Sequence, residues 1–504
     1  SAGGNIGEAS GTNNGHLDLT IDELTAIAGG SEGIFVSNTQ ALTIAEVDTV
    51  IVNRVDTAAT PGNEADEASQ SDIITTSNGH IVLVTAGSLT VTEGADTTDN
   101  VGVSANGTGN ILLQSAADIA LQAVVKSGGG NISVIAAANV SQSADGDIET
   151  QGGTGTIDLE ATGGSIDMTD GAVASAFGGS LRYKAASNII IGEFNTVSTS
   201  NGDVSIVAGA HIIDNDTDVD VFSGGLLLSA GGTISAPVET AVERIAAQSG
   251  SGNIQIIEDD DVSIALLNVS VNRLGDNAQI SSIISDSENG LTSNSNGSIV
   301  FQTKAGSGSI SVDAPVTADS GGNILLQAQG TGKTLTLNKN TTTGSGNITL
   351  LADSHIVQNS TVSTSGGSVD VEAAASVSMT ESGLTETKGG NIQYKAVNDI
   401  TVGKIDTSTE QYDRTNWGLL SIVSDNGAVT DASAAGDTDI DIYAQQARIT
   451  SSGGIGESAN ALELDTDTLA AELTSASASN VVSIAFNSDI NISEVTGTVD
   501  PVSV

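Results

Sequence analysis

The chain has 504 residues, of which 62 are acidic and 14 are basic, so its formal net charge is −48. Such an acidic chain repels nucleic-acid phosphates and anionic lipid surfaces, which excludes both as partners. It has no cysteine, which excludes a disulfide framework and thiol chemistry, and its 2% aromatic residues are too few for a set of ordinary globular cores.

The chain repeats itself over a long interval, about 220 residues. Its start contains GNIGEAS followed by LDLTIDELTA, and its end contains the related GGIGESANALELDTDTLAA. Leu24, Ile245 and Leu469 occupy the same place in successive copies of this motif. We therefore expect one long repeat at 1–228, a second at 229–452 and the start of a third at 453–504, as in a segment of something longer.

The two long repeats align through most of their length. The matching segments are VNRV at 52–55 with VNRL at 271–274, GNILLQ at 109–114 with GNILLQ at 322–327, TIDLEA at 156–161 with SVDVEA at 368–373, and RYKA at 182–185 with QYKA at 393–396. The spacing between partners drifts along the chain, so insertions and deletions fall between these segments. That pattern is typical of a stacked scaffold with variable turns.

A shorter repeat lies inside the long one, in which a glycine, often followed by asparagine, precedes an alternating apolar strand. Asn110 is followed in this way by Asn131, and Asn323 by Asn347. Strict alternation places Ile111 and the next apolar residue but one on the same face. We predict an all-β parallel β-helix, an elongated rod with three short strands in each coil of about 21–25 residues. The asparagines are expected at turn positions that tolerate a left-handed backbone.

Two stretches depart from this pattern. Residues 57–72 contain Pro61 and Gly62 among polar residues, and we expect a flexible polar excursion there. The loop at 410–418 is longer than its counterpart in the first long repeat and holds Tyr412, Arg414 and Trp417. Those residue types suit ligand contact, and the alternative is a loop whose tryptophan packs against the coils.

Alternating aspartates form a candidate metal site. On a strand, Asp214, Asp216 and Asp218 would point to one face, where their oxygens could gather Ca²⁺. The alternative is a solvated acidic face without a cofactor. A second alternating run includes Asp437, Asp439 and Asp441, and a continuous acidic run covers Glu258 to Asp261. The four histidines are scattered without metal-ligand spacing.

The repeated GGNIxLxA coils with Ser, Thr, Asn and Gly turns resemble the right-handed parallel β-helix repeats of filamentous-haemagglutinin-type adhesins and of giant repetitive bacterial surface proteins. The resemblance covers essentially the whole chain, but the family's N-terminal secretion motifs are not seen. It implies an extracellular stalk, fibre or adhesive surface on a bacterial cell.

Three functions from different classes follow. The first is a structural β-solenoid segment of a large secreted surface protein, forming a stalk, fibre or surface layer. The second is an adhesin that binds a glycan or protein through side loops. The third is a β-helix carbohydrate enzyme, which we do not expect because basic and aromatic residues are scarce. Since the end strands of a solenoid need partners, we also expect head-to-tail self-association or continuation in a longer chain.

Overall fold

The computed structural model describes residues 2–9, 15–65, 68–94, 99–198, 201–409, 414–475, 480–487 and 489–492. The chain forms two compact units. Unit 1 comprises Ser1–Leu227 together with Asn268–Ser287, and unit 2 comprises Leu228–Leu267 together with Glu288–Val504.

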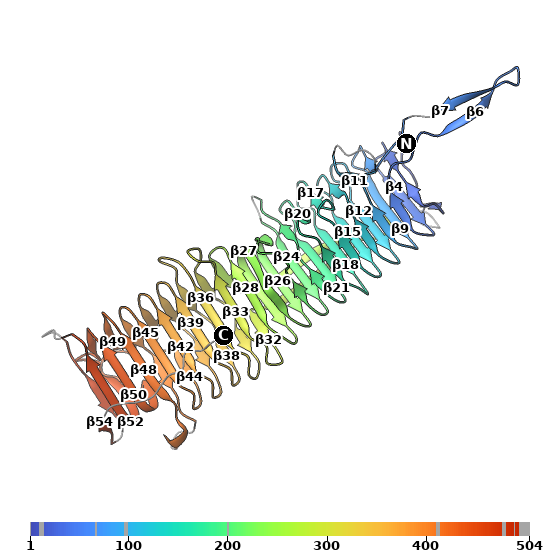
Figure 1. Cartoon of the computed structure of the whole chain (residues 1–504). Helices are drawn as coiled ribbons and strands as arrows, with labels where there is room; N and C mark the ends of the chain where they lie inside the picture. The colour runs from blue at the N-terminus through green and yellow to red at the C-terminus, as the bar shows by residue number, and fades with distance from the viewer. Residues whose placement is uncertain are drawn as a thin grey trace. The chain divides into compact units, whose positions relative to one another are not determined.

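Both units are parallel β-solenoids, which confirms the predicted fold class (Figure 1). The described residues make about 20 coils of about 23 residues each, within the predicted range. Most coils contribute three strands, as expected, and each strand pairs in parallel with its equivalents in the neighbouring coils. The first strand of a coil is usually longer than the other two.

Unit 1 stacks three strands per coil over successive turns. The first strands are β1 (Leu17–Leu19), β4 (Gly33–Asn38), β9 (His80–Thr85), β12 (Ile111–Ser115), β15 (Ile132–Ala136), β18 (Ile157–Ala161), β21 (Leu181–Ala185) and β24 (Asp203–Ala208). The second strands are β2 (Glu23–Leu24), β5 (Leu42–Ile44), β10 (Leu89–Val91), β13 (Ile119–Leu121), β16 (Val140–Gln142), β19 (Ile166–Met168), β22 (Ile189–Ile190) and β25 (Ile212–Ile213). The third strands are β3 (Ala26–Ala28), β8 (Ile73–Thr75), β11 (Val101–Ala105), β14 (Val124–Ser127), β17 (Ile148–Thr150), β20 (Val173–Ala176) and β23 (Glu193–Asn195).

Unit 2 repeats the arrangement. Its first strands are β28 (Ile254–Glu258), β33 (Ile299–Thr303), β36 (Ile324–Ala328), β39 (Ile348–Ala352), β42 (Val369–Ala373), β45 (Ile392–Ala396) and β48 (Leu419–Ser424). The second strands are β29 (Val262–Ile264), β34 (Ile310–Val312), β37 (Leu335–Leu337), β40 (Ile356–Gln358), β43 (Val377–Met379), β46 (Ile400–Val402), β49 (Ala428–Asp431) and β51 (Gly454–Ile455). The third strands are β32 (Leu291–Ser293), β35 (Val316–Ala318), β38 (Thr341–Thr343), β41 (Thr361–Ser363), β44 (Leu384–Glu386) and β47 (Lys404–Asp406).

A few strands are longer or lie at the C-terminal end. They are β26 (Val221–Ala230), β27 (Ile234–Ser249), β50 (Ile442–Ser451), β52 (Leu462–Leu473), β53 (Ile484–Phe486) and β54 (Asn491–Ile492). Strand β27 pairs with β28, β29 and β32, so a single strand replaces the three short ones of its coil.

The core is a set of columns in which the same position of each coil lies on its neighbour. Ile111, Ile132 and Ile157 are register partners on β12, β15 and β18, and each is fully buried. Alternation along each strand turns one side chain inward and the next outward. Small and β-branched residues thus fill a narrow interior, which explains why the chain needs so few aromatic residues.

The glycine of the short repeat is required by close approach between coils. A Cβ on Gly322 would lie 2.0 Å from the carbonyl oxygen of Gly297, and a Cβ on Gly346 would lie 1.9 Å from that of Gly322. The column continues through Gly367, Gly390 and Gly418 with distances of 1.8 to 1.9 Å. A side chain cannot fit at these separations, so each of these coils places a glycine here.

The asparagine after that glycine forms a hydrogen-bonded ladder. Asn347 donates its backbone N–H to Oδ1 of Asn323 at 2.8 Å, and Ser368 donates its backbone N–H to Oδ1 of Asn347 at 2.8 Å. Unit 1 has the same bond from Asn131 to Asn110. None of these asparagines has a positive φ, so the expectation of a left-handed backbone is wrong for them. The amide groups are needed because they satisfy a backbone N–H in the next coil.

We predict that Asn347→Ala destabilises the protein by about 1–3 kcal/mol, because Ser368 then keeps a backbone N–H without its acceptor. Urea denaturation followed by circular dichroism measures the free energy of unfolding. Asn359→Ala is the matched control, since Asn359 makes an exposed amide contact to Asn338. Equal effects of the two substitutions would contradict a structural role for the ladder.

Two hairpins leave the solenoids and form their own two-stranded sheets. The first consists of β6 (Ile51–Val55) and the antiparallel β7 (Pro61–Ala65), and it projects from unit 1 (Figure 1). We call Ile51–Ala65 the projecting hairpin. The second consists of β30 (Leu266–Leu274) and β31 (Ile280–Asn289), and we call it the docked hairpin. The expectation of a flexible excursion at 57–72 is therefore wrong over Pro61–Ala65, which pairs with β6 and begins with proline, as an edge strand can.

Candidate functional site

The docked hairpin covers one outer face of unit 1. That face carries a ladder of side chains from the first strands, joined by strand register. The ladder consists of Phe35, Val82, Leu112, Ser133, Asp158, Arg182 and Ser205, and we call it ladder 1. All seven side chains are buried although they lie between inward-facing positions of their strands.

At one end of ladder 1 the contact is apolar. Leu274 and Ala278 of the docked hairpin form a buried cluster with Phe35, Val82 and Leu112. Polar contacts fix the register of the hairpin on this face. The backbone N–H of Leu274 donates to Oγ of Ser133 at 3.0 Å, that of Asn272 donates to Oγ1 of Thr156 at 2.9 Å, and the amide of Asn110 donates to the carbonyl oxygen of Ala278 at 2.8 Å.

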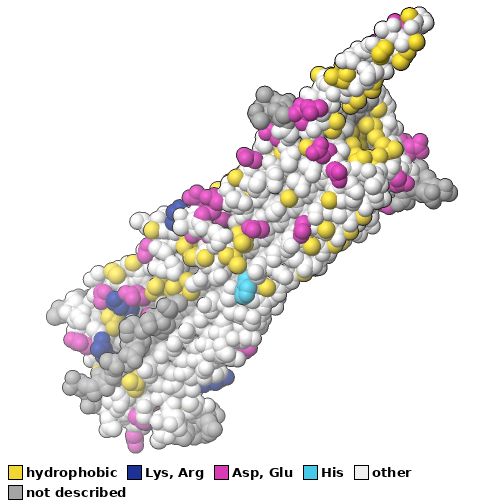
Figure 2. Space-filling view, turned by 45° about the vertical axis from the view of Figure 1, so that its right-hand side comes forward, with side chains coloured by type: hydrophobic (Ala, Val, Ile, Leu, Met, Phe, Trp, Pro, Cys, Tyr) yellow, Lys and Arg dark blue, Asp and Glu magenta, His cyan; other side chains and the backbone are white. Residues whose placement is uncertain are grey.

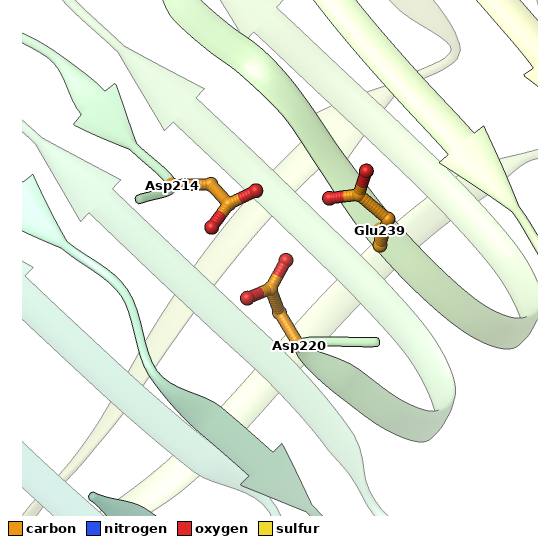
Figure 3. Close-up of side chains that lie close together, drawn as sticks. All are labelled: Asp214, Asp220 and Glu239. Carbon is orange, nitrogen blue, oxygen red and sulfur yellow. The ribbon is translucent and has the colours of Figure 1, made fainter. Parts of the chain in front are cut away.

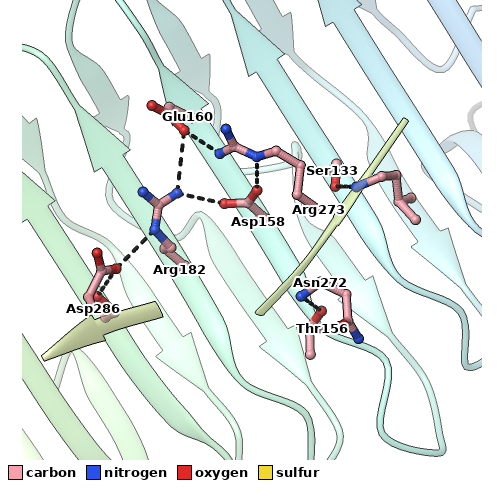
Figure 4. A network of polar contacts seen from close by, with 10 residues as sticks. Ser133, Thr156, Asp158, Glu160, Arg182, Asn272, Arg273 and Asp286 are labelled. Atoms are coloured by element: carbon pink, nitrogen blue, oxygen red, sulfur yellow. Dashed lines mark hydrogen bonds and ion pairs between the residues drawn. The ribbon is translucent and has the colours of Figure 1, made fainter. Parts of the chain in front are cut away.

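At the other end of ladder 1 the contact is an ionic network (Figure 4). Arg182 donates to Oδ1 of Asp158 at 2.8 Å and to Oδ2 of Asp286 on the hairpin at 2.9 Å. Arg273, also on the hairpin, donates to Oδ2 of Asp158 at 2.6 Å and pairs with Glu160. Asp158 is completely buried, so its charge depends on these two guanidinium groups.

The network also shifts the pKa of Glu160. Burial alone would raise this pKa, but the hydrogen bond and charge of Arg273, with the charges of Arg182 and Lys184, hold it below its usual value. A carboxyl with a depressed pKa stabilises the folded state at neutral pH and loses that contribution as the pH falls through the folded pKa. The ionic network therefore holds the docked hairpin most tightly when the pH lies above the acidic range in which Glu160 becomes protonated.

The aspartates predicted to bind calcium do not lie on a strand. Strand β25 ends at Ile213 and the next strand begins at Val221, so the run from 214 to 220 is a turn, and the expectation of a shared strand face is wrong. Asp216 donates its backbone N–H to Oδ1 of Asp214, and Asp218 donates its own to Oδ1 of Asp216. The aspartates make turns because a carboxylate can accept from the backbone two residues ahead.

Asp214 instead lies beside Asp220. Both are buried, their oxygens lie within 4.8 Å of one another, and Figure 3 shows the carboxyl groups turned toward each other. Glu239, also drawn there, belongs to β27 of unit 2. Calcium binding by Asp214, Asp216 and Asp218 stays a prediction, and the carboxylates brought together include only the first of these three.

Unit 2 contains a cluster of three carboxylates at the matching place of the second long repeat. Asp431, Asp441 and Glu463 each place one oxygen within 4.8 Å of the others. Burial raises the pKa of Asp441 to about 8, and the nearby charge of Asp431 adds to the effect. Burial also raises the pKa of Glu463. Such a cluster can share a proton, and oxygens of this kind are also ligands for hard cations.

A surface hollow of about 400 Å³ adjoins this cluster. Its acidic lining includes Asp437 and Asp439 of the second predicted run, together with Asp431 and Asp441. Lys404 and Tyr443 also line it, and the ammonium of Lys404 lies 5.0 Å from the centre of the Tyr443 ring. The sequence indicated two alternating acidic runs but not which residues of the following coils would meet them.

The long loop at 410–418 is tied to the coils of unit 2. Tyr412 lies outside the described residues. Arg414 begins a short 3-10 helix (η1, Arg414–Asn416), donates to Oδ1 of Asp467 at 3.0 Å and lies 5.6 Å from the centre of the Trp417 ring. Trp417 itself is buried and packs edge-on against Tyr443. Ligand contact by this loop stays a prediction, and the tryptophan does not supply an exposed surface for it.

Glu258, from the continuous acidic run, is fully buried on β28. Its carboxyl accepts hydrogen bonds from the hydroxyl of Thr240 at 2.6 Å and from the backbone N–H groups of Val242 at 3.0 Å and Asp260 at 3.2 Å. Burial raises the pKa of Glu258 to about 8. The side chain is therefore protonated in the folded state over a range in which it is ionised in the unfolded chain.

We predict that Glu258→Gln removes part of the pH dependence of stability. With a folded pKa above the unfolded one, the contribution of Glu258 is fully present below about pH 4.5 and is lost as the pH rises toward 8, by on the order of 4 kcal/mol. Urea denaturation at pH 5 and pH 8.5 should thus show a smaller loss of stability for the variant than for the wild type. The exposed Glu243→Gln is the control, and parallel profiles for wild type and Glu258→Gln would contradict the prediction.

The docked hairpin was missed by the sequence reasoning, although a signal was present. The chain has only 14 basic residues, and yet Arg54 and Arg273 occupy the same place in VNRV and VNRL. A rare residue type retained at equivalent positions indicates a specific acidic partner.

Comparisons with protein-family models, with curated proteins and with solved structures give no match to this chain. The β-solenoid follows from the structure itself, while membership of the haemagglutinin-like family stays an expectation from the sequence. Among the described residues, no helix is long and apolar enough to span a membrane.

Proposed function

We propose that this chain is a structural β-solenoid segment of a large secreted cell-surface protein, forming a stalk, extracellular fibre or surface layer by the stacking of its coils. The observation that carries the proposal is the parallel register of successive coils within each unit, for example from Ile299 through Ile324 and Ile348 to Val369. A fold of this kind lengthens by adding coils.

The surface chemistry supports the same proposal. A formal charge of −48 opposes non-specific contact between neighbouring chains and favours solubility. A polar network of unit 1, between Asp158, Arg182, Arg273 and Asp286, joins a hairpin to the coils. Its charged groups thus serve cohesion of the solenoid.

Surface labelling of intact source cells tests the proposal. Antibodies raised against the purified chain should label intact cells, and external protease should remove the label. Permeabilised cells serve as the control for antibody access. Label that is present only after permeabilisation would contradict a cell-surface structure.

The alternative function is an adhesin that binds a glycan or protein through side loops. Glycan arrays probed with the wild type and with a variant lacking 410–418 separate the two functions. The structural proposal expects no difference between them, whereas an adhesin using this loop would lose binding on its deletion. For the enzyme alternative we expect no cleavage of a panel of polyuronates.

A further inference from the structure

The projecting and docked hairpins are two copies of one element. Val52, Asn53 and Arg54 match Val271, Asn272 and Arg273 at one constant offset in the numbering. Their turns are also the same. Asp56 donates its backbone N–H to the carbonyl oxygen of Thr60 at 3.1 Å. Gly275, which lies at that offset from Asp56, donates its own to the carbonyl oxygen of Gln279 at 2.9 Å.

The left-handed residue of each turn confirms the match. Ala59 has a φ of 61°, and Ala278, which lies at the same offset from it, has a φ of 59°. A non-glycine residue rarely adopts this backbone conformation, so its recurrence at the equivalent position indicates that the two turns share one design.

The surroundings of the two copies differ. Leu274 of the docked hairpin is 3% exposed, whereas the equivalent Val55 of the projecting hairpin is 62% exposed. Arg273 lies against buried Asp158, whereas Arg54 forms only an exposed pair with Glu64 at 3.4 Å. Hydrophobic side chains are visible along this projecting arm in Figure 2. The residues of the projecting hairpin that are equivalent to the contact residues of the docked hairpin are thus exposed to solvent.

Unit 2 carries a matching ladder, which we call ladder 2. Its members are joined by strand register as in ladder 1 and are Gln255, Val300, Leu325, Thr349, Asp370, Gln393 and Ser421. In the same order, ladder 1 reads Phe, Val, Leu, Ser, Asp, Arg, Ser, so four of the seven residue types are identical and the fourth is a hydroxyl residue in both.

Ladder 2 also carries the acceptor groups of ladder 1. Asp370 and Glu372 are equivalent to Asp158 and Glu160, and Thr349 is equivalent to Ser133, the residue whose hydroxyl accepts from the hairpin backbone. The hydroxyl of Thr349 is buried and makes no hydrogen bond with the residues that the structure describes. The pKa of Asp370 is raised by burial and by the charge of Glu372.

A hollow of about 280 Å³ lies at the ends of β39, β42 and β45, beginning two positions beyond the ladder 2 residues of those strands. It is lined in part by Leu351, Glu372 and Lys395. Glu372 is 45% exposed in its pair with Lys395, so its carboxylate is accessible to a second cation. Along ladder 2 the apolar side chains come before the hydroxyl of Thr349, and the carboxyl groups of Asp370 and Glu372 come after it. Ladder 1 presents the equivalent groups to the docked hairpin in the same order.

We propose that the projecting hairpin of one copy of this chain docks on ladder 2 of a second copy. Arg54 then pairs with Asp370 and Glu372, Val55 packs over Val300 and Leu325, and the backbone N–H of Val55 donates to Thr349. The partner is identified by the internal precedent, in which the same hairpin sequence binds the same ladder. This inference deepens the proposed structural function, on which it rests, by naming the contact that joins copies.

Sedimentation velocity of the full chain tests the proposal. The wild type should associate as its concentration rises, and Arg54→Glu or Glu372→Arg should each raise the dissociation constant by about tenfold or more, because a charge is reversed opposite a matching one. Val55→Asp should have the same effect through the apolar end. Lys304→Glu is the matched control, since it makes the same charge change at an exposed residue of unit 2 outside the ladder.

The decisive sample is a mixture of the two charge variants. Arg54→Glu keeps an intact ladder 2 and Glu372→Arg keeps an intact projecting hairpin, so the mixture should form heterodimers although each variant alone is monomeric. Recovery of the heterodimer supports the proposal. A monomeric wild type, or association that neither variant weakens, would overturn it. If the wild type associates but neither variant weakens the association, the copies join by another surface and the proposed structural function stands. Surface labelling tests that function independently.

Discussion

Gly322→Ala is expected to destabilise the protein by at least about 3 kcal/mol, since forced overlap with backbone is among the few causes of large effects. The added Cβ would lie 2.0 Å from the carbonyl oxygen of Gly297 and 2.9 Å from its carbonyl carbon. Neither atom can move without separating two coils, because both belong to the backbone of the preceding turn. Urea denaturation followed by circular dichroism measures the effect.

The neighbouring Gly321 provides a closely matched control. A Cβ there would meet only side-chain oxygens, the nearer being that of Asn296 at 3.3 Å, and the residue is exposed. Gly321→Ala should therefore change the free energy of unfolding by roughly 0.5 kcal/mol or less. If the two alanine variants were equally stable, the coils would not be stacked as closely as the structure shows.

Arg182→Met is expected to cost about 3–5 kcal/mol, because it removes one of the two cations that neutralise Asp158 within the protein. Arg182 is buried and links Asp158, Glu160 and Asp286. Its loss also removes a contact between ladder 1 and the docked hairpin. We therefore expect faster amide hydrogen exchange in Asn268–Ser287 as well as a lower free energy of unfolding.

Lys395→Met is the control for the loss of an ion pair. Lys395 and Glu372 lie on the corresponding strands of unit 2, but their side chains are 42% and 45% exposed, so this pair contributes about 0–1 kcal/mol. Suppose that Arg182→Met were as stable as Lys395→Met and left amide hydrogen exchange in the docked hairpin unchanged. The network would then not be what holds the hairpin in place.

The coil architecture was predictable from the sequence because every coil repeats the same short sequence pattern. Glycine, asparagine and the alternating apolar residues recur from coil to coil, and the parallel register confirms that equivalent positions stack. The reason for the asparagine was not predictable from its type alone. Asparagine is common in left-handed turns, and only the stack shows that Asn347 instead accepts from the backbone of the next coil.

The contacts made by the side loops were not predictable, since they depend on where each loop turns and packs and not on the repeated pattern of the coils. Asp214 meets Asp220 because the segment between them turns back instead of continuing as a strand. Arg273 reaches Asp158 from a distant part of the sequence, a separation for which periodicity gives no signal. Trp417 is buried because its loop folds onto Tyr443, and a loop's length and composition do not specify where it packs.

An electron cryomicroscopy map of the purified chain at high concentration tests the central claim most directly. The account predicts strands stacked about 4.8 Å apart within each unit, the docked hairpin over ladder 1, and density from a second copy over Asp370 and Glu372. The density on ladder 2 should have the shape of a two-stranded hairpin ending at Ala59. A map of separate copies, with no second copy over Asp370 and Glu372, would contradict the account.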